Sequence, residues 1–294
     1  MVTTASTSGT ADNDGVGIHW VLDRPSDLRP GSERPLLLIN GLGSPLVAFE
    51  PGFVALLVDR GLSVARFDNR DTGRSDRVER GPDGQSTPYT IADMAADAVA
   101  VLDAVGWTGA NVVGQSMGGM IAQQLAIDHP DRVRSLVPFM TSSGEPGVGR
   151  STEAAAEALL QPAPPERQAW LDHRVATERV WASPAHWSEA LVLAKAEALW
   201  DHGIDHRGTF RQFRAIRAAG RRDVALARLT VPTLVLHGSA DTLITPDGGR
   251  HLADVIPGAG YHEIVGLGHD LPPGLWDEIA GRIADFVDQV EAAP

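Results

Sequence analysis

Ser116 stands in the middle of the sequence GQSMG at residues 114–118, which matches the pattern G-x-S-x-G. The apolar residues 110–113 precede it and a helical pattern starts at Met117, so Ser116 is predicted to lie in a sharp turn between a strand and a helix. Glycines two residues away on either side allow backbone segments to approach closely. Taken alone, in a chain with 31 glycines, the pentapeptide would favour a serine that only caps a helix. The strand–turn–helix setting instead predicts a nucleophile.

A serine hydroxyl becomes a good nucleophile when a base accepts its proton, and histidine is suited to this task near neutral pH. Among the ten histidines, His269 follows the expected strand 261–265 and precedes the last expected helix, in a loop beside glycine. His237 ends an earlier strand and is expected to be structural. The histidines between residues 142 and 228 are irregularly spaced and do not indicate a metal site. His269 is therefore the predicted general base.

The carboxylate that orients this base is expected between the serine and the histidine along the chain, in a loop after a strand. Asp241 meets both conditions, because it follows the expected strand 233–237. The other possible position for the acid, after the strand 135–139, holds the sequence MTSS and no carboxylate. Asp241 is the predicted acid. A turn-forming aspartate is its simplest alternative, and Asp247 and Asp270 are the next candidates.

Acyl transfer through a serine also needs N–H donors for the negatively charged oxygen of the intermediate. The N–H of Met117, at the start of the helix after the serine, is the first predicted donor. The sequence NGLG at 40–43 follows the first core strand, so the N–H of Leu42 is the second predicted donor, although a simple glycine-rich turn is the alternative. Gly41 and Gln115, beside these donors, are predicted to contact the substrate.

These residues require a fold that brings separate loops to one edge of a sheet. Short apolar runs alternate with longer helical patterns, which is typical of an α/β fold with a mostly parallel sheet flanked by helices. Strands are expected at 36–39, 63–67, 110–113, 135–139, 233–237 and 261–265. Helices are expected at 51–60, 90–105 and 117–128 and at the end of the chain. Thr90 and Asp93 resemble the capping box of a helix N-terminus.

The alternation is interrupted from residue 142 to residue 228 by an alanine-rich, mostly helical stretch, which we call the cap. The α/β core is then expected to comprise residues 16–141 and 229–294. The cap contains four of the seven tryptophans, and these are predicted to contact an apolar part of the substrate, although packing is their more usual role. They are Trp170, Trp181, Trp187 and Trp200.

The bulk properties limit the partners and the compartment. The net charge of −13 argues against nucleic acid and anionic membranes as partners. Without cysteine, a thiol nucleophile and disulfides are excluded. Residues 1–15 are expected to form a flexible tail rather than a signal peptide, and no apolar run approaches the roughly 20 residues that span a bilayer, so a cytoplasmic protein is expected. Its expected partner is a small molecule, with no cofactor, and nothing in the sequence indicates its oligomeric state.

Together these segments resemble the α/β-hydrolase superfamily from about residue 18 to the end, apart from the cap. The sequences RDTGRS at 70–75, AADAVAVLD at 95–103 and TVPTLV at 230–235 resemble, more narrowly, serine esterases of the aclacinomycin methylesterase type. The resemblance implies a triad of Ser116, Asp241 and His269, N–H donors at Leu42 and Met117, and a helical cap.

Three positions differ from the family pattern or vary within it. Asp71 stands where glycine is usual in the loop at 68–75, which normally supports the site without taking part in catalysis. Asn40 replaces a common histidine, and Gln115 occupies a varied position beside the serine. The expected reaction is hydrolysis of a carboxylic ester of a small apolar or aromatic substrate through an acyl-enzyme on Ser116. Lactonase, C–C bond hydrolase, acyltransferase and perhydrolase activities would use the same triad and remain alternatives. A ligand receptor with a vestigial triad is the alternative outside the enzymes.

Overall fold

A single sheet of eight strands forms within the residues that the computed structural model describes, which are 4–29, 31–79 and 89–292. Its spatial order is β1-β2-β4-β3-β5-β6-β7-β8, where the β1–β2 and β2–β4 pairs are antiparallel and all other pairs are parallel. The predicted α/β fold with a mostly parallel sheet is therefore confirmed. The strands are β1 (Thr4–Asn13), β2 (Val16–Pro25), β3 (Pro35–Ile39), β4 (Ser63–Phe67), β5 (Ala110–Gln115), β6 (Val133–Phe139), β7 (Leu234–Gly238) and β8 (Gly260–Ile264).

Ten α-helices of the described residues surround this sheet and extend beyond one end of it. They are α1 (Pro51–Asp59), α2 (Ile91–Ala104), α3 (Met117–Asp128), α4 (Glu153–Leu160), α5 (Arg167–Trp181), α6 (Glu189–Gly203), α7 (His206–Ala219), α8 (Asp223–Leu226), α9 (Asp247–Val255) and α10 (Trp276–Glu291). Short 3-10 helices occur at Leu46–Ala48, Pro130–Arg132, Pro184–His186 and Pro273–Leu275. The capping box predicted at the start of α2 is confirmed, since the side chains of Thr90 and Asp93 bond each other's backbone N–H.

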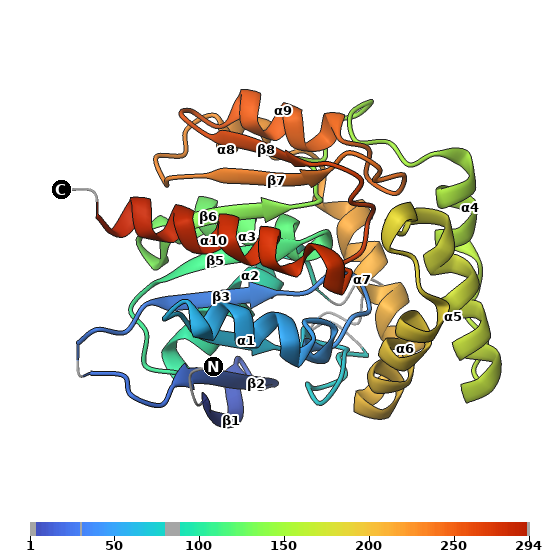
Figure 1. Cartoon of the computed structure of the whole chain (residues 1–294), viewed down its shortest axis with the longest axis horizontal. Helices are drawn as coiled ribbons and strands as arrows, with labels where there is room; N and C mark the ends of the chain where they lie inside the picture. Colours follow the sequence, from blue (N-terminus) through green and yellow to red (C-terminus); the bar gives the residue numbers. More distant parts are fainter. Residues whose placement is uncertain (1–3, 30, 80–88, 293–294) are drawn as a thin grey trace.

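The core is divided into two apolar layers, one on each face of the sheet. Leu36 and Leu38 of β3 contact the layer under α1 and α10, whereas Leu37 and Ile39 contact the layer under α2, α3, α8 and α9. Because successive side chains of a strand point to opposite faces, one short apolar run supplies both layers. Figure 1 shows α1 and α10 in front of the sheet, with α4 to α7 gathered beyond the ends of the parallel strands.

The N-terminal segment differs from the flexible tail expected for residues 1–15. Residues 4–13 form β1, which pairs along its whole length with β2, and residues 1–3 lie outside the described residues. Asp14 and Gly15 join the two strands with φ angles of 51° and 82°. Positive φ at both positions is the pattern of a two-residue hairpin turn, for which Asp-Gly is a favoured sequence. Most side chains of β1 are exposed, so backbone pairing rather than an apolar pattern places this strand.

The helices α4 to α7 of the cap lie between β6 and β7 in the chain, over the carboxyl ends of the strands (Figure 1). They have a small apolar cluster of their own, in which Trp170 and Leu171 of α5 meet Ala196 and Leu199 of α6. The short α8 is also inside the stretch assigned to the cap, but it contacts α3 and α9 of the core. Among the helices of the described residues, none is long and apolar enough to cross a membrane.

Candidate active site

Ser116, in the turn between β5 and α3, has a strained backbone with φ of 56° and ψ of −120°. Such a conformation costs a non-glycine residue about 1–3 kcal/mol, so the surrounding structure must enforce it. A Cβ on Gly114 would lie 2.2 Å from the carbonyl oxygen of Gly118, and a Cβ on Gly118 would lie 2.1 Å from that of Ile39. The two glycines of G-x-S-x-G are therefore required by close packing, which holds Ser116 at the end of β5.

Two hydrogen bonds to the neighbouring strand region fix this turn further. The N–H of Ser116 donates to the carbonyl of Phe139 at 2.9 Å, and the Thr141 hydroxyl donates to the carbonyl of Ser116 at 2.8 Å. Both backbone groups of the strained residue are thus bonded, which leaves its hydroxyl as the group available for chemistry.

His269 and Asp241 form a buried pair, with Nδ1 of His269 2.7 Å from Oδ2 of Asp241. Because a carboxylate can only accept, Nδ1–H is the donor, and Nε2 remains able to accept a proton. Burial alone would raise the pKa of Asp241, but the charges and hydrogen bonds of His269 and His237 hold it well below its ordinary value. Asp241 is therefore ionised at neutral pH and fixes the orientation of the imidazole.

Asp241 is itself held by three further groups. Its Oδ1 accepts the backbone N–H groups of Leu243 and Ile244, both at 2.9 Å. Nε2 of His237 lies 3.4 Å from Oδ2 of Asp241 and 2.8 Å from the carbonyl oxygen of Ile244. His237, expected to be structural, is completely buried beside the acid and supports it. Its position at the end of β7, just before the loop of the acid, was the one sequence signal for this contact.

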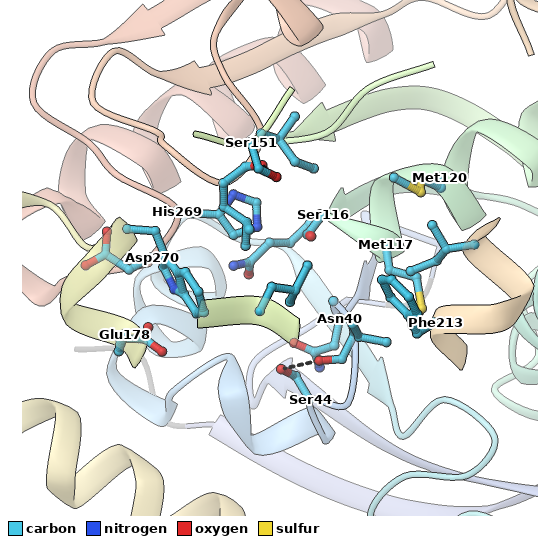
Figure 2. A pocket seen from close by; sticks show the side chains of 18 of the residues that line it. Asn40, Ser44, Ser116, Met117, Met120, Ser151, Glu178, Phe213, His269 and Asp270 are labelled. Carbon is cyan, nitrogen blue, oxygen red and sulfur yellow. Dashed lines mark hydrogen bonds between the residues drawn. The ribbon is translucent and has the colours of Figure 1, made fainter. Parts of the chain in front are cut away.

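Ser116 and His269 line the same cavity, which has a volume of about 460 Å³. Figure 2 shows both side chains at this cavity, with Met117 and Asp270 among the other labelled residues around it. Among the described contacts there is no hydrogen bond between the Ser116 hydroxyl and His269. In substrate-free enzymes such bonds are often long and shorten only when a substrate is bound.

The predicted oxyanion donors lie at this cavity as well, since both Leu42 and Met117 line it. The loop that carries Leu42 passes close to the serine, because a Cβ on Gly41 would lie 3.3 Å from the Cβ of Ser116. The side-chain amide of Asn69 donates to the carbonyl of Asn40 at 3.1 Å and so anchors the start of this loop. The two predicted N–H donors therefore flank the serine from separate segments of the core.

The loop of His269 is also bonded to the end of α5 in the cap. The N–H of His269 donates to the carbonyl of Trp181 at 2.7 Å, and the N–H of Gly268 donates to Oγ of Ser183 at 2.8 Å. Ser183 in turn donates its N–H and its hydroxyl to Oδ1 of Asp270, at 3.0 and 2.5 Å. Nothing near Ser183 in the sequence marks this contact, because its partners lie in a distant segment.

The two alternative acids have other partners. Asp270 bonds Ser183, and burial followed by the charge of Glu178 raises its pKa. Asp247 accepts the N–H of Gly149 at 3.0 Å. Asp241 is the carboxylate that bonds the imidazole of His269. Across the part of the chain that the structure describes, no three His, Asp or Glu side chains meet in a way that could hold a metal ion.

The cap supplies much of the cavity wall, but three of its four tryptophans are not in it. Gly41, Gln115 and Trp181, which were predicted to contact the substrate, line the cavity. Trp187 lines a smaller depression next to it, and Trp170 and Trp200 pack together inside the cap with ring centroids 5.4 Å apart. The cavity lining therefore does not support the predicted substrate contact for these three, since Trp170 and Trp200 face each other between α5 and α6, and Trp187, just before α6, lies against the guanidinium of Arg179. The apolar wall of the cap includes Leu159, Leu160, Leu199, Phe213 and Ile216.

The chain is similar in sequence and fold to several known proteins. A family model described as the alpha/beta hydrolase fold matches residues 34–272. Rhodomycin D methylesterase DnrP of Streptomyces peucetius is 33% identical over 278 residues, covering 86% of this chain and 90% of the relative. Rhodomycin D methylesterase DauP of Streptomyces sp. (strain C5) is 32% identical over 276 residues with the same coverage. The crystal structure of the enol-lactonase from Burkholderia xenovorans LB400 has a TM-score of 0.75 and 27% identity, covering 95% of this chain and all of that one.

Proposed function

Because the chain belongs to the α/β-hydrolase family, we propose that it is a serine hydrolase that cleaves a carboxylic ester of a small apolar or aromatic substrate. Nε2 of His269 takes the proton of the Ser116 hydroxyl, and Oγ attacks the ester carbonyl carbon. The N–H groups of Leu42 and Met117 stabilise the oxyanion of the tetrahedral intermediate. The protonated His269, oriented by Asp241, gives its proton to the departing alcohol.

The second half of the reaction releases the acid. His269 takes a proton from a water molecule, and the hydroxide attacks the acyl carbon. The intermediate then collapses to the carboxylic acid, and the protonated His269 gives its proton to the departing oxygen of Ser116, which restores both residues. The observation that carries this proposal is the His269–Asp241 pair at 2.7 Å, beside a cavity that also contains the strained Ser116. The methylesterase names of two relatives support an ester as the substrate. The apolar wall of the cavity supports an apolar or aromatic acyl or alcohol group.

The test is turnover of p-nitrophenyl esters of increasing acyl length by the wild type and by Ser116→Ala. We expect the substitution to reduce kcat by at least about 10³-fold, because the nucleophile is lost. Ser44→Ala is a matched control, since Ser44 lines the same cavity and, among the described residues, its hydroxyl bonds only the carbonyl of Leu42, at 3.4 Å. Unchanged turnover in Ser116→Ala would refute the proposal. A phosphonate that modifies the wild type and not Ser116→Ala, measured by intact mass, identifies the nucleophile directly.

A lactonase is the second candidate, because the enol-lactonase structure matches the chain at 27% identity over 95% of its length. A lactone is a cyclic ester, so the same groups would open it, and the alcohol would stay attached to the acyl group. Comparison of kcat/KM for an aryl ester and for a lactone of similar size separates the two candidates. A preference for the lactone of more than about tenfold, or about 1.4 kcal/mol, would favour the lactonase.

A further inference from the structure

The loop that carries Leu42 is in close contact with α7 of the cap. The N–H of Gly43 donates to Oε1 of Gln212 at 2.8 Å. A Cβ on Gly43 would lie 2.6 Å from the Thr209 hydroxyl oxygen, one turn earlier on the same helix. Gly43 has a φ of 63°, so both its conformation and its contact with α7 require glycine. The residue next to the predicted oxyanion donor is therefore held by a helix of the cap.

The amide of Gln212 is fully buried, and each of its ends is bonded. Its Nε2 donates to the carbonyl of Arg70 at 2.8 Å and to Oγ1 of Thr72 at 2.7 Å. A backbone carbonyl can only accept and a backbone N–H can only donate, so the contacts with Arg70 and Gly43 allow a single orientation of the amide. Gln212 thus joins the loop at 40–43 to the loop at 68–75.

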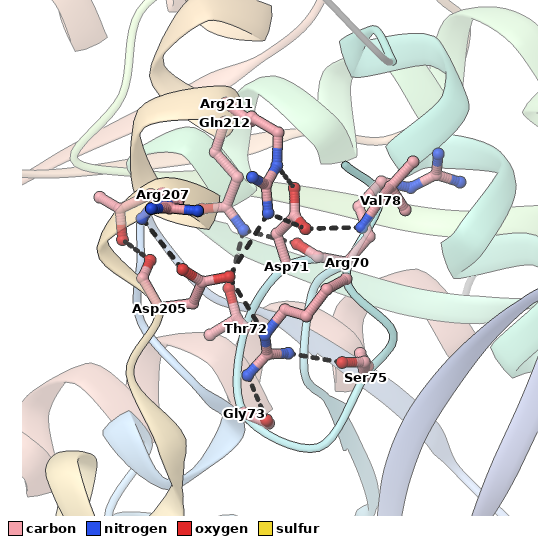
Figure 3. Close-up of polar contacts among 12 residues, drawn as sticks. Arg70, Asp71, Thr72, Gly73, Ser75, Val78, Asp205, Arg207, Arg211 and Gln212 are labelled. Carbon is pink, nitrogen blue, oxygen red and sulfur yellow. Dashed lines mark hydrogen bonds and ion pairs between the residues drawn. The ribbon is translucent and has the colours of Figure 1, made fainter. Parts of the chain in front are cut away.

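The helix that carries Gln212 is anchored by the residue that departs from the family pattern. Arg211 makes two bonds of 2.7 Å to Asp71, which also accepts the hydroxyl of Tyr89 and the N–H of Val78. Figure 3 shows Arg211 and Gln212 reaching from α7 to the loop that carries Asp71 and Thr72. The hydrogen bonds to Asp71 raise the pKa of Arg211, so its guanidinium stays charged. This anchoring restrains α7 against rotation, and a restrained helix can hold the Gly43 N–H accurately.

We propose that Gln212 is a positioning residue for the oxyanion hole. It holds the peptide after Leu42 so that the N–H of Leu42 points to the place where the oxyanion forms beside Ser116. This inference rests on the proposed function, because it assumes that Leu42 is a donor to the intermediate. A donor in an oxyanion hole is effective only when its N–H group points at the position of the oxyanion. A displacement of this group by about 1 Å lowers the rate by about 10²-fold.

The test compares Gln212→Met, which keeps the volume and removes both bonding functions, with the wild type. Its matched control is Thr72→Val, which removes one partner of the Gln212 amide and leaves the Gly43 bond intact. We measure kcat and KM with the best p-nitrophenyl ester, and Ki for a trifluoromethyl ketone with the same acyl chain, which forms an oxyanion when Ser116 adds to it. A thermal melt confirms that each variant is folded.

For Gln212→Met we expect kcat to fall by about 10–100-fold with KM within about threefold of the wild type. The Ki of the ketone should rise by the same factor as kcat/KM falls, and Thr72→Val should stay within about threefold in kcat. An unchanged kcat, or a higher KM at unchanged kcat, overturns the proposal. If Gln212→Met does not fold, Gln212→Glu is used instead, because it keeps an acceptor for the N–H of Gly43. A kcat of Gln212→Glu within about threefold of the wild type supports the proposal, and a tenfold loss of kcat overturns it.

Ser116→Ala separates this inference from the function on which it rests. If Ser116→Ala is inactive and Gln212→Met is fully active, only the positioning role is overturned. If Ser116→Ala keeps its turnover, the proposed function and the positioning role fail together.

Discussion

Gly268→Ala tests whether the contact between the cap and the loop of His269 positions the base. A Cβ on Gly268 would lie 2.2 Å from the carbonyl oxygen of Trp181 and 2.6 Å from the backbone nitrogen of Ser183. These are backbone atoms, so they cannot rotate away as a side chain can. The same Trp181 carbonyl accepts the N–H of His269 at 2.7 Å. The substitution must therefore move the loop, the end of α5, or both.

The size of the effect follows from this overlap. Cβ atoms essentially never approach closer than 3.0 Å, so the two segments must separate from 2.2 Å by about 0.8 Å. If His269 takes up this shift, kcat falls by about 10²-fold, because a displacement of about 1 Å at a reacting group costs that much. Overpacking of this kind also lowers the free energy of unfolding by about 1–3 kcal/mol.

The assay is kcat with a p-nitrophenyl ester, together with urea denaturation of the same protein. Gly266→Ala is the matched control, because Gly266 is in the same loop, has a φ of 76°, and has nothing within 4 Å of an added Cβ. Its strained backbone costs about 1–2 kcal/mol, similar to the loss in Gly268→Ala, but no segment has to move. We expect Gly266→Ala to keep kcat within about threefold. Equal kcat values for the two variants would refute a positioning role for the contact.

Three further predictions concern buried carboxylates. Asp241→Asn should lower kcat for p-nitrophenyl esters by about 10⁴-fold, as loss of the orienting acid does in serine hydrolases. Asp270→Asn should keep most of the activity, because its amide oxygen can still accept a hydrogen bond from Ser183. The opposite result would reassign the acid. The pKa of Asp241 is lower in the folded protein than its ordinary value of 3.8. The Asp241 carboxylate therefore contributes its full stabilisation above about pH 4, and this contribution is lost as the pH falls through the pKa of the folded protein. Urea titrations of the wild type and Asp241→Asn should therefore differ most above about pH 4 and converge in acid. Asp71→Gly installs the residue usual in this family but removes both 2.7 Å bonds of Arg211 and leaves it the longer contact with Asp205 at 3.4 Å. Thermal and urea denaturation should therefore show a free energy of unfolding lower by about 2–4 kcal/mol, and a more stable variant would contradict the ion-pair argument.

The residues proposed for the triad could be chosen from the sequence because each lies directly after a strand. A parallel sheet brings the carboxyl ends of its strands to one edge, so local patterns and chain order identified Ser116, Asp241 and His269 without any knowledge of contacts. The strands themselves were recognisable because both of their faces are buried, which produces short continuous apolar runs such as residues 36–39.

The contacts between the cap and the core could not be predicted in this way. Ser183 and Gln212 bond loops that are far away in the chain, and neither residue stands in a local motif. The tryptophans show the same limit, since a helix pattern indicates that Trp170 and Trp200 are buried without showing which neighbour buries them. The β1–β2 hairpin was missed because its exposed strand carries no apolar pattern, although Asp14-Gly15 is a turn signal that could have revealed it.

The bonds from Trp181, Ser183 and Gln212 to core loops also limit how this enzyme can be redesigned. A cap transplanted from a relative would bring its own cavity wall, but it would lose activity unless it also carried groups equivalent to Ser183 and Gln212 at the same places. New substrate preferences are therefore better sought by substitution of cavity-facing side chains, such as Leu160 on α4 and Ile216 on α7, than by exchange of whole segments. In the cap, the residues that bond core loops must therefore be kept, whereas the side chains that face the cavity can be changed.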